Sequence, residues 1–328
     1  MQKIIIIADC REDFPSTIEG KHYNDHYSKK SVMEIQQAII NLGYECNFVG
    51  GINILIDYLN SKQIYKDTLF LNFSDGLTQK NRRMQAPLLL ELMNAKYSGS
   101  DPFVVGAVND KYFTNKFLKE HHIHVPNCVL YKEWTERIVL EYPVVVKPNS
   151  EGSSIEISQS SICYNSLEAN QQSLRLISKG YTPIIEEYIE GYEVTNFLIG
   201  NAGNFVLNEL IISEYENKIY FEELVFGQEE KSSGKRRQHV LTNENAIFPV
   251  EPIKEQSCKI FNLLGLFDFA RIDYRISHDG KPTFIEVNSL PVFSYTSEIG
   301  TICTFYNKSL EQILDLLINT AKERLCIL

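Results

Sequence analysis

The chain has 328 residues, 44% of them hydrophobic and 23% charged, and a formal net charge of −10. A chain of this length can bury several hydrophobic cores, so we expect two or three subdomains. The negative charge argues against sequence-independent binding of nucleic acid, because such binding needs many Lys and Arg contacts to phosphates.

The seven cysteines are scattered through the chain, and none forms a CxxC pair. Such spacing is typical of reduced thiols and not of a disulfide framework or a zinc site. The apolar run at 4–7 is too short for a signal sequence, and no stretch approaches the length of a membrane span. We therefore expect a cytoplasmic protein that is not attached to a membrane.

The first hundred residues predict a small parallel sheet. Strands are expected at 3–8, 45–49 and 69–73, with helices between them at 31–42 and 52–59. Ser31 and Glu34 have the spacing of a capping box, so the first helix should begin at Ser31. The alternation of strands and helices implies parallel strands, and ligands gather at the carboxyl ends of such strands.

Two more helices are predicted next. The first covers 87–93 and is followed by a turn at 97–100, which closes the first subdomain. The second covers 110–121, where the spacing of the apolar residues places Phe113, Phe117 and Leu118 on the buried side and Lys111 and Lys116 elsewhere.

A strand at 143–147 ends in a lysine and is followed at 148–154 by a loop of small hydroxyl and glycine residues. A second strand is expected through Ile155 and Ile157. A loop of this kind can place backbone N–H groups over phosphate oxygens. It lacks the GxxxxGK[ST] pattern of a P-loop, and a plain hairpin turn fits the residues about as well.

The chain after residue 181 alternates in the manner of strands. A strand is expected at 182–188, a hairpin turn at 200–203 and helices at 255–264 and 308–324. Residues 213–240 are polar and include a basic cluster at 231–237. This cluster is either a solvated loop or a lid whose cations reach phosphates when it closes.

The segment 270–288 predicts a β-hairpin around an Asp-Gly turn. If Asp279 and Gly280 are the two loop residues, residues whose numbers sum to 559 face each other. The expected pairs are Asp273 with Glu286 and Arg271 with Asn288 on a polar face, and Ile272 with Val287 and Tyr274 with Ile285 on an apolar face.

Two carboxylates in directly opposite positions are about 5 Å apart at Cβ and repel each other. A hard divalent cation would remove this repulsion, and Asn288 would add a neutral oxygen ligand. A cation with so few protein ligands keeps room for phosphates, which points to Mg²⁺ with a nucleotide. The alternative is a solvated face on which Arg271 neutralises the two acids.

Seven short segments, found in one order from about residue 72 to residue 297, resemble the ATP-grasp superfamily and, within it, the D-alanine–D-alanine ligase family. The segments are 97–100 (YSGS), Asp110-Lys111 with Lys116, 146–148 (VKP), 151–154 (EGSS), 186–193 (EEYIEGYE), 271–273 (RID) and 285–291 (IEVNSLP). The resemblance implies an α/β protein with the ATP-grasp fold. It also implies three subdomains, 1–99, 100–185 and 186–328, with ATP held between the last two.

The resemblance assigns a nucleotide and metal site to residues that match the family motifs. Lys111 and Lys147 would contact the phosphates of ATP. The flap over these phosphates would consist of Gly152, Ser153 and Ser154. The adenine pocket would be lined by Glu186, Glu187, Tyr188 and Ile189, and the ribose site would be formed by Glu193. Asp273, Glu286 and Asn288 would bind two Mg²⁺ ions, with Mn²⁺ as an alternative.

The implied reaction is the ATP-dependent joining of a carboxylate to an amine through an acyl phosphate, with release of ADP and phosphate. Arg271, Ser153 and Lys218 would be the catalytic residues, and Arg271 would stabilise charge on the acyl phosphate. The small-molecule amino-acid substrates would be contacted by Ser297 and Asp75. Ser297 would hold the carboxylate of the second, amine-bearing substrate. The resemblance also suggests a homodimer formed through the first subdomain.

The sequence departs from the family in the part that would hold the amino acids. Family members that join two D-alanines carry a glutamate motif near the amino terminus for the first substrate's ammonium, and residues 9–31 do not reproduce it. Val292 stands where the family has glycine, and residues 214–220 match the family lid only loosely. The substrates are therefore open between D-alanine and other amino acids. Transfer to a carrier-protein thiol, and nucleotide binding without catalysis, are the alternatives.

Overall fold

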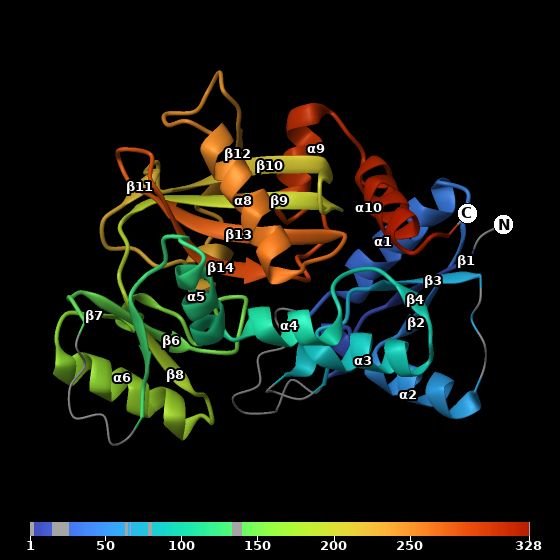
Figure 1. The fold of residues 1–328 in the computed structure, drawn as a ribbon, viewed down its shortest axis with the longest axis horizontal. Coiled ribbons are helices and arrows are strands. Elements are labelled where there is room, and N and C mark those ends of the chain that lie inside the picture. The colour runs from blue at the N-terminus through green and yellow to red at the C-terminus, as the bar shows by residue number, and fades with distance from the viewer. Residues whose placement is uncertain are drawn as a thin grey trace.

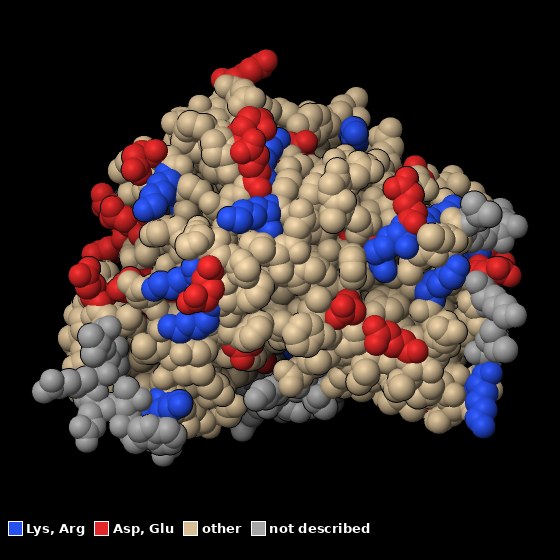
Figure 2. Space-filling model, in the orientation of Figure 1, with Lys and Arg blue, Asp and Glu red and all other residues tan. Residues whose placement is uncertain are grey.

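The computed structural model describes residues 3–14, 26–62, 65, 67–77, 81–132 and 140–327. These residues form three sheets, each in a different part of the chain (Figure 1). Within these ranges, no helix has the length and apolar character needed to cross a membrane. On the face drawn in Figure 2, acidic and basic side chains are interspersed, and the coloured residues form no broad basic field there.

The first sheet is parallel, as the sequence predicts, with the strand order β2-β1-β3-β4. Its strands are β1 (Lys3–Ile7), β2 (Glu45–Gly50), β3 (Thr68–Asn72) and β4 (Lys96–Tyr97). Helices α1 (Lys29–Asn41) and α10 (Leu310–Arg324) cover one face, and α2 (Ile52–Ser61) and α3 (Gln85–Leu92) cover the other. Both faces are apolar because alternate residues of β1 enter opposite cores. Two short 3₁₀ helices, η1 (Arg11–Asp13) and η2 (Arg82–Met84), lie in the loops.

The first helix begins two residues earlier than the sequence predicts. The side chain of Ser28 accepts a hydrogen bond from the backbone N–H of Ser31 at 3.0 Å, so Ser28 is the N-cap. Its backbone is extended, as an N-cap requires, and the helix starts at Lys29. The predicted start at Ser31 is therefore wrong. The capping-box spacing pointed to Ser31 and Glu34, whereas the helix is capped by Ser28, which has no Glu or Gln three residues later.

The second sheet is antiparallel, with the strand order β5-β8-β6-β7. Its strands are β5 (Cys128–Leu130), β6 (Val144–Pro148), β7 (Ile162–Cys163) and β8 (Pro183–Glu187). Helix α6 (Ser166–Ser178) packs on one face, and η3 (Gln159–Ser161) precedes β7. In Figure 1 this small sheet and α6 form a separate lobe beside the third sheet.

The strand expected through Ile155 and Ile157 is not present. The described residues there form turns, because Ser153, Ser154 and Glu156 have φ angles of 54°, 58° and 61°. A strand needs negative φ at every residue, so this backbone cannot join a sheet. It instead forms a folded loop that lies over the space between the second and third sheets.

Helices α4 (Pro102–Asn109) and α5 (Lys111–Glu120) pack against the third sheet. The buried side of α5 agrees only in part with the predicted one: Leu118 is buried and Phe117 packs on the core, but Phe113 is 48% exposed, whereas Lys111 is 7% exposed. The apolar spacing was misleading because this side of α5 faces polar partners. Asn115 donates a hydrogen bond to Glu186 at 2.9 Å, and Lys111 Nζ lies 3.5 Å from Glu286.

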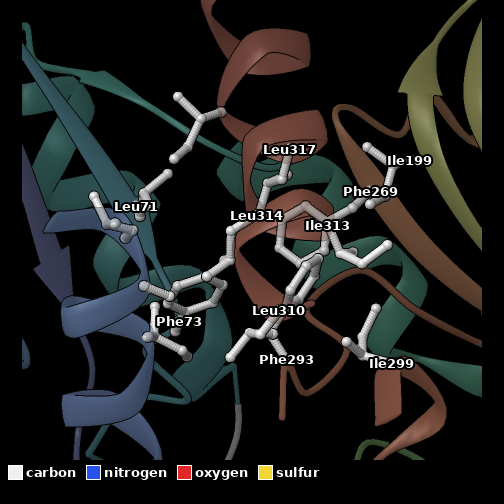
Figure 3. Packing of buried hydrophobic residues seen from close by; sticks show 14 of the residues in the cluster. Leu71, Phe73, Ile199, Phe269, Phe293, Ile299, Leu310, Ile313, Leu314 and Leu317 are labelled. Atoms are coloured by element: carbon white, nitrogen blue, oxygen red, sulfur yellow. The ribbon is translucent and has the colours of Figure 1, made fainter. Parts of the chain in front are cut away.

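The third sheet has the strand order β12-β10-β9-β13-β14, and β11 also pairs with β9. Its strands are β9 (Gly191–Asn201), β10 (Asn204–Tyr215), β11 (Tyr220–Phe221), β12 (Arg236–Leu241), β13 (Phe269–Ile276) and β14 (Pro282–Asn288). Helix α8 (Glu251–Leu264) covers one face, and α9 (Glu298–Tyr306) and α10 lie on the other. Figure 3 shows Leu314 and Leu317 of α10 between Leu71 of the first sheet and Ile199 of the third, so one core joins these two sheets.

The β13–β14 hairpin has the predicted pairing at its polar end: Arg271 with Asn288, Ile272 with Val287 and Asp273 with Glu286. Nearer the turn the prediction is wrong, because Tyr274 faces Phe284 and not Ile285. The loop holds three residues instead of two, since Ser277 N donates to Lys281 O at 3.1 Å. A bulge at Ile285 then shifts the register back by one. The extra loop residue and the bulge cancel, so the polar end of the hairpin keeps the predicted register.

Candidate functional site

A cleft with about 810 Å³ of open space lies between the second and third sheets; we call it the main cleft. Its lining includes nine residues that the sequence assigned to nucleotide or metal: Lys147, Ser154, Glu186, Glu187, Tyr188, Ile189, Glu193, Asp273 and Glu286. A smaller space of about 300 Å³, the side cavity, is lined by Lys111, Gly152 and Asn288 among others. Glu151 and Glu286 line both, so the two spaces adjoin.

Lys147 is held in place by a buried acid. Its Nζ lies 2.6 Å from Glu186 Oε2, and the other oxygen of Glu186 accepts the hydrogen bond from Asn115. Burial alone would lower the pKa of Lys147, but Glu186 and Glu286 raise it above its ordinary value. Lys147 therefore stays charged at neutral pH with its ammonium fixed in the main cleft.

Lys111 lies beside the polar edge of the third sheet, the name we give to Asp273, Glu286 and Asn288 on β13 and β14. Its ammonium donates to the backbone oxygen of Glu151 and lies 3.5 Å from Glu286 Oε2. Burial lowers the pKa of Lys111, and Glu286 acts against that shift. Burial by itself would raise the pKa of Glu286, but Lys111, Lys147, Arg271 and Lys231 together lower it to about 2. Glu286 is therefore an anion at any pH near neutrality.

Arg271 makes a bidentate contact with Asp273, with Nε–Oδ1 and Nη2–Oδ2 distances of 3.0 and 2.9 Å. Its third nitrogen, Nη1, lies 3.4 Å from Glu298, which also accepts a hydrogen bond from Gln238 at 3.2 Å. Burial raises the pKa of Glu298, but Arg271 and Arg236 lower it to about 2. Burial raises the pKa of Asp273 despite its contact with Arg271. The guanidinium is thus fixed between two carboxylates.

The acids of the polar edge have the donor chemistry of a hard-cation site. Asp273, Glu286 and Asn288 supply oxygen ligands from two neighbouring strands. The Nδ2 atom of Asn288 is buried without a hydrogen-bond partner in the described part of the chain, so its amide is available to a ligand. Among the described residues, no three His, Cys, Asp or Glu side chains are grouped so that they could hold a metal ion by themselves. A metal here would rely on phosphate or water for its remaining ligands.

The loop over the main cleft, residues 151–159, meets a second segment from the third sheet, residues 225–231. We call them the flap and the strap. Ser154 Oγ donates to Phe226 O at 2.5 Å, and Gln159 Nε2 donates to Val225 O at 2.7 Å. Gly227 lies so close that a Cβ on it would be 2.5 Å from Ile157 O. Flap and strap therefore close the cleft together.

The strap carries Lys231 on the short helix α7 (Gln228–Ser232), and this exposed lysine also lines the main cleft. Of the basic cluster in the sequence, Lys231 is the member found in that lining. Lys218, the lysine assigned by motif, lies on an exposed turn where Tyr215 and Lys218 exchange backbone hydrogen bonds. Its catalytic role stays a prediction.

The two residues assigned to the amino-acid substrates, Ser297 and Asp75, line neither the main cleft nor the side cavity. Ser297 is the N-cap of α9, with its Oγ 2.8 Å from the carbonyl oxygens of Val292 and Ser294. Asp75 is buried in the first subdomain, where Oδ1 accepts a hydrogen bond from Arg83 Nε at 2.8 Å. Part of the segment at 9–31, residues 15–25, lies outside the described residues.

Four residues at the site were missed by sequence reasoning as individual contributors: Arg83, Asn115, Lys231 and Glu298. Lys231 had a signal in the basic cluster, although nothing in the pattern separated it from its neighbours. The other three carry no signal in one sequence, because each reaches the site through tertiary packing.

A family model described as "D-ala D-ala ligase C-terminus" matches residues 116–319, well over half of the chain. The chain belongs to this family. It is therefore an ATP-dependent, ADP-forming ligase that makes an amide bond. The D-alanine–D-alanine ligase of Fervidobacterium nodosum is 30% identical over 315 residues, which cover 91% of this chain and 95% of that protein.

Solved structures of similar proteins share the ATP-grasp fold along the whole chain. The D-alanine–D-alanine ligase of Bacillus anthracis, solved in complex with ATP, has a TM-score of 0.72, 20% identity and 98% coverage of both chains. The VanG D-Ala:D-Ser ligase of Enterococcus faecalis has a TM-score of 0.72 and 20% identity, and covers 98% of this chain and 99% of its own. Both the fold and the family named from sequence motifs are confirmed.

Proposed function

We propose that this ligase joins the carboxylate of one small amino acid to the amine of another through an acyl phosphate. The observation that carries the proposal is the polar edge of the third sheet. There Asp273 faces Glu286 across neighbouring strands, and Lys111 and Lys147 approach the same acid from two sides. This arrangement suits a triphosphate with its metal ions at the point where a carboxylate must attack.

The main cleft is proposed to take the nucleotide. The bulge at Ile285 turns this side chain into the cleft, where it offers an apolar surface for a base. The backbone that follows β8, from Glu186 to Ile189, would recognise the adenine edge. Glu193, paired with Arg275 at 2.8 Å, keeps oxygen lone pairs for the ribose hydroxyls. Lys111, Lys147 and the flap would contact the phosphates.

Asp273, Glu286 and Asn288 are proposed to hold Mg²⁺, with two ions expected and Mn²⁺ as an alternative. The fit is supported by their oxygen chemistry and by the unpartnered amide of Asn288, which can turn its oxygen toward a cation. Bound Mg²⁺ would supply neutralisation of the phosphate charge. The low pKa of Glu286, about 2, keeps that ligand deprotonated throughout the neutral range.

In the first step, the donor carboxylate attacks the γ-phosphate and ADP leaves; Lys111 and Lys147 offset the charge that concentrates there. In the second step, the acceptor amine attacks the acyl carbonyl and phosphate leaves. Arg271 stabilises the negative charge on the carbonyl oxygen in this step. The closed flap and strap exclude water, which would otherwise hydrolyse the acyl phosphate. The strap would also bring Lys231 to the phosphates.

The substrates are proposed to be amino acids, with D-alanine as the first candidate for both positions because the relative from Fervidobacterium nodosum is named for that product. Ser297 would contact the acceptor carboxylate and Asp75 would act near the donor. Val292 stands where the family has glycine and would narrow the space for the acceptor amino acid. An acceptor other than D-alanine is therefore the second candidate.

The proposal is tested by a screen of amino-acid pairs for phosphate release that depends on both ATP and Mg²⁺, with mass spectrometry of the product. We expect one pair to give a dipeptide, ADP and phosphate in equal amounts. Tight binding of Mg–ATP with no turnover on any pair would contradict the proposal and favour a nucleotide-binding regulator. A product found only on an added carrier-protein thiol would favour acyl transfer.

A homodimer through the first subdomain is also proposed. Leu88 and Leu92 on α3 and Phe103 on α4 are 49%, 63% and 74% exposed, and these large apolar side chains would be covered in a dimer. Light scattering at micromolar concentration should give twice the 37.8 kDa mass of the chain. A Leu92→Glu variant should give the monomer mass.

A further inference from the structure

Arg83 reaches from the first subdomain into the reaction site of the other two. It lies on η2, after the third strand of the first sheet, and is 8% exposed. Asp75 of the same subdomain holds its Nε atom at 2.8 Å. The terminal nitrogens lie against the flap: a Cβ built on Gly152 would be 2.9 Å from Nη2 and 3.1 Å from Nη1. A side chain at position 152 would therefore displace the guanidinium from its place against the flap.

The side cavity has Arg83 on one wall and the polar edge of the third sheet on the other. Lys111, Glu286 and Asn288 line the same space, and so does Gly152. The cavity adjoins the main cleft through Glu151 and Glu286, which line both. The side cavity therefore opens toward the place where the terminal phosphate of the nucleotide would lie, from the side opposite to the base.

The side cavity can take an oxyanion although two acids line it. Its cations are Lys111 and Arg83, and its acid Glu286 lies 3.5 Å from Lys111 Nζ and is a proposed ligand of Mg²⁺. Glu151, the acid at the junction, is offset by Arg82, whose Nη2 atom lies 3.5 Å from its carboxylate. An anion that enters here would be met by a planar guanidinium with paired N–H groups, the geometry that suits carboxylate and phosphate oxygens.

We propose that Arg83 is a further catalytic residue, whose guanidinium binds an oxyanion where the terminal phosphate and the donor carboxylate meet. This inference rests on the proposed function. In the first step, a carboxylate oxygen forms a bond to the γ-phosphorus while the bond from that phosphorus to the β–γ bridging oxygen breaks. The electron pair of the broken bond leaves with ADP, and no proton moves. The donor carboxylate and the γ-phosphate, both anions, must approach each other closely. The positive charge of Arg83, on the side of the donor, offsets their repulsion.

In the side cavity, the oxyanion bound by Arg83 is either the phosphoryl group or the donor carboxylate. Two measurements distinguish these two ligands. The first is the affinity for Mg–ADP with and without aluminium fluoride, a mimic of the phosphoryl group in transfer. The second is the KM for D-alanine in ATP-dependent phosphate release. Both are made on the full chain and on Arg83→Lys and Arg83→Met, with melting temperatures to verify folding. Lysine keeps the charge but loses the fork of N–H groups.

Arg324→Lys is the matched control. Arg324 also joins distant parts of the chain, with Nη2 2.7 Å from Asp268 and 2.8 Å from Tyr97 O, but it lines neither space. It should lower the melting temperature without changing either measurement. The Arg83 variants should bind Mg–ADP within about twofold of wild type and lose about 10³-fold in kcat, the scale seen for an arginine finger.

Each outcome has a defined meaning. Loss of the extra affinity given by aluminium fluoride assigns Arg83 to the phosphoryl group, and a raised D-alanine KM with that affinity intact assigns it to the carboxylate. A lower melting temperature with wild-type kcat, KM and fluoride response in both Arg83 variants overturns the proposal and leaves Arg83 a structural clamp. Failure of the wild-type protein itself to bind Mg–ADP overturns the proposed function instead.

Discussion

The strand-built half and the loop-built half of the proposed site differ in how their residues are positioned. Asp273 and Glu286, the proposed metal ligands, lie on paired strands and are fixed by hydrogen-bonded register. The loop-built half consists of the flap, the strap and the residues proposed to contact the amino acids, such as Ser297 at the start of α9 and Arg83 on η2. Strand register follows from the sequence by counting, whereas loop positions depend on how the three sheets pack. The strand-built half is therefore readable from sequence and the loop-built half is not.

The largest expected effect is on the strand-built half. Glu286→Ala should reduce ATP-dependent phosphate release by about 10³-fold or more, because it removes a metal ligand and leaves Lys111 and Lys147 without their shared acid. Circular dichroism should show a retained fold. Activity near the wild-type value would remove the metal assignment.

Lys147→Ala should be almost as damaging, and its effect should appear in nucleotide binding as well as in turnover. The variant removes a phosphate contact and leaves Glu186 buried without its 2.6 Å partner. We expect the Kd for Mg–ATP, measured by calorimetry, to rise about tenfold or more. Asn115→Leu is the companion variant, because it removes the other hydrogen bond to Glu186 while keeping Lys147, and it should give a smaller rise.

A smaller effect is expected from the lysines of the loop-built half, where motif and structure point to different residues. Lys231 lines the main cleft, whereas Lys218 lies on an exposed turn. Lys231→Ala should lower kcat about tenfold to a hundredfold, and Lys218→Ala should have the weaker effect. Steady-state kinetics on the two variants side by side decides between them. A larger loss in Lys218→Ala would favour the motif assignment.

Gly227→Ala tests closure of the same half. A Cβ at this position would lie 2.5 Å from Ile157 O, so the strap must move away from the flap. We expect a severalfold rise in the ratio of ATP hydrolysed to amide formed, because water then reaches the acyl phosphate. An unchanged ratio would show that the contact between flap and strap does not exclude water. Gly234→Ala is the control for backbone strain: its φ angle of 71° strains an alanine, but the added Cβ meets nothing within 4 Å, so it should lower stability and leave the ratio unchanged.

The smallest expected effect is on stability at low pH. The pKa of Glu298 is lowered to about 2 from its usual value of 4.5, so its ionised form stabilises the fold. This contribution is fully present above about pH 5 and is lost as the pH falls from there toward 2. Glu298→Gln should therefore show a weaker loss of melting temperature between pH 6 and pH 3.5 than wild type, by roughly 2 °C. Parallel curves for the two proteins would contradict the assigned ion pair.

The accuracy of the predictions made from sequence follows the same division between paired strands and the rest of the site. The pairing of Asp273 with Glu286 was predicted correctly, although the predicted two-residue loop was one residue short and the bulge at Ile285 corrected the count. On α5 the burial of Leu118 was predicted correctly, but Phe113 is exposed and Lys111 is buried, because apolar spacing cannot reveal that Lys111 faces a polar cleft. The loop after β6 was predicted to continue as a strand, and left-handed residues such as Ser153 prevent this.

The contribution of Arg83 could not be predicted for a further reason. Its partners, Asp75 and Gly152, are 8 and 69 residues away in the sequence, and the contact with Gly152 requires the first subdomain to lie against the flap. A single sequence contains no signal for such a contact. The family motifs identified the family without Arg83, because they lie in other segments, such as β6, the flap, β13 and β14.

The central claim, that a carboxylate attacks the terminal phosphate beside Glu286 and Lys111, is tested most directly with a donor amino acid carrying ¹⁸O in its carboxylate. An acyl phosphate passes one of those oxygens to the released phosphate. The account predicts one ¹⁸O atom in each phosphate released with the amide product, as read by mass spectrometry of the phosphate. Amide formation with unlabelled phosphate would contradict it.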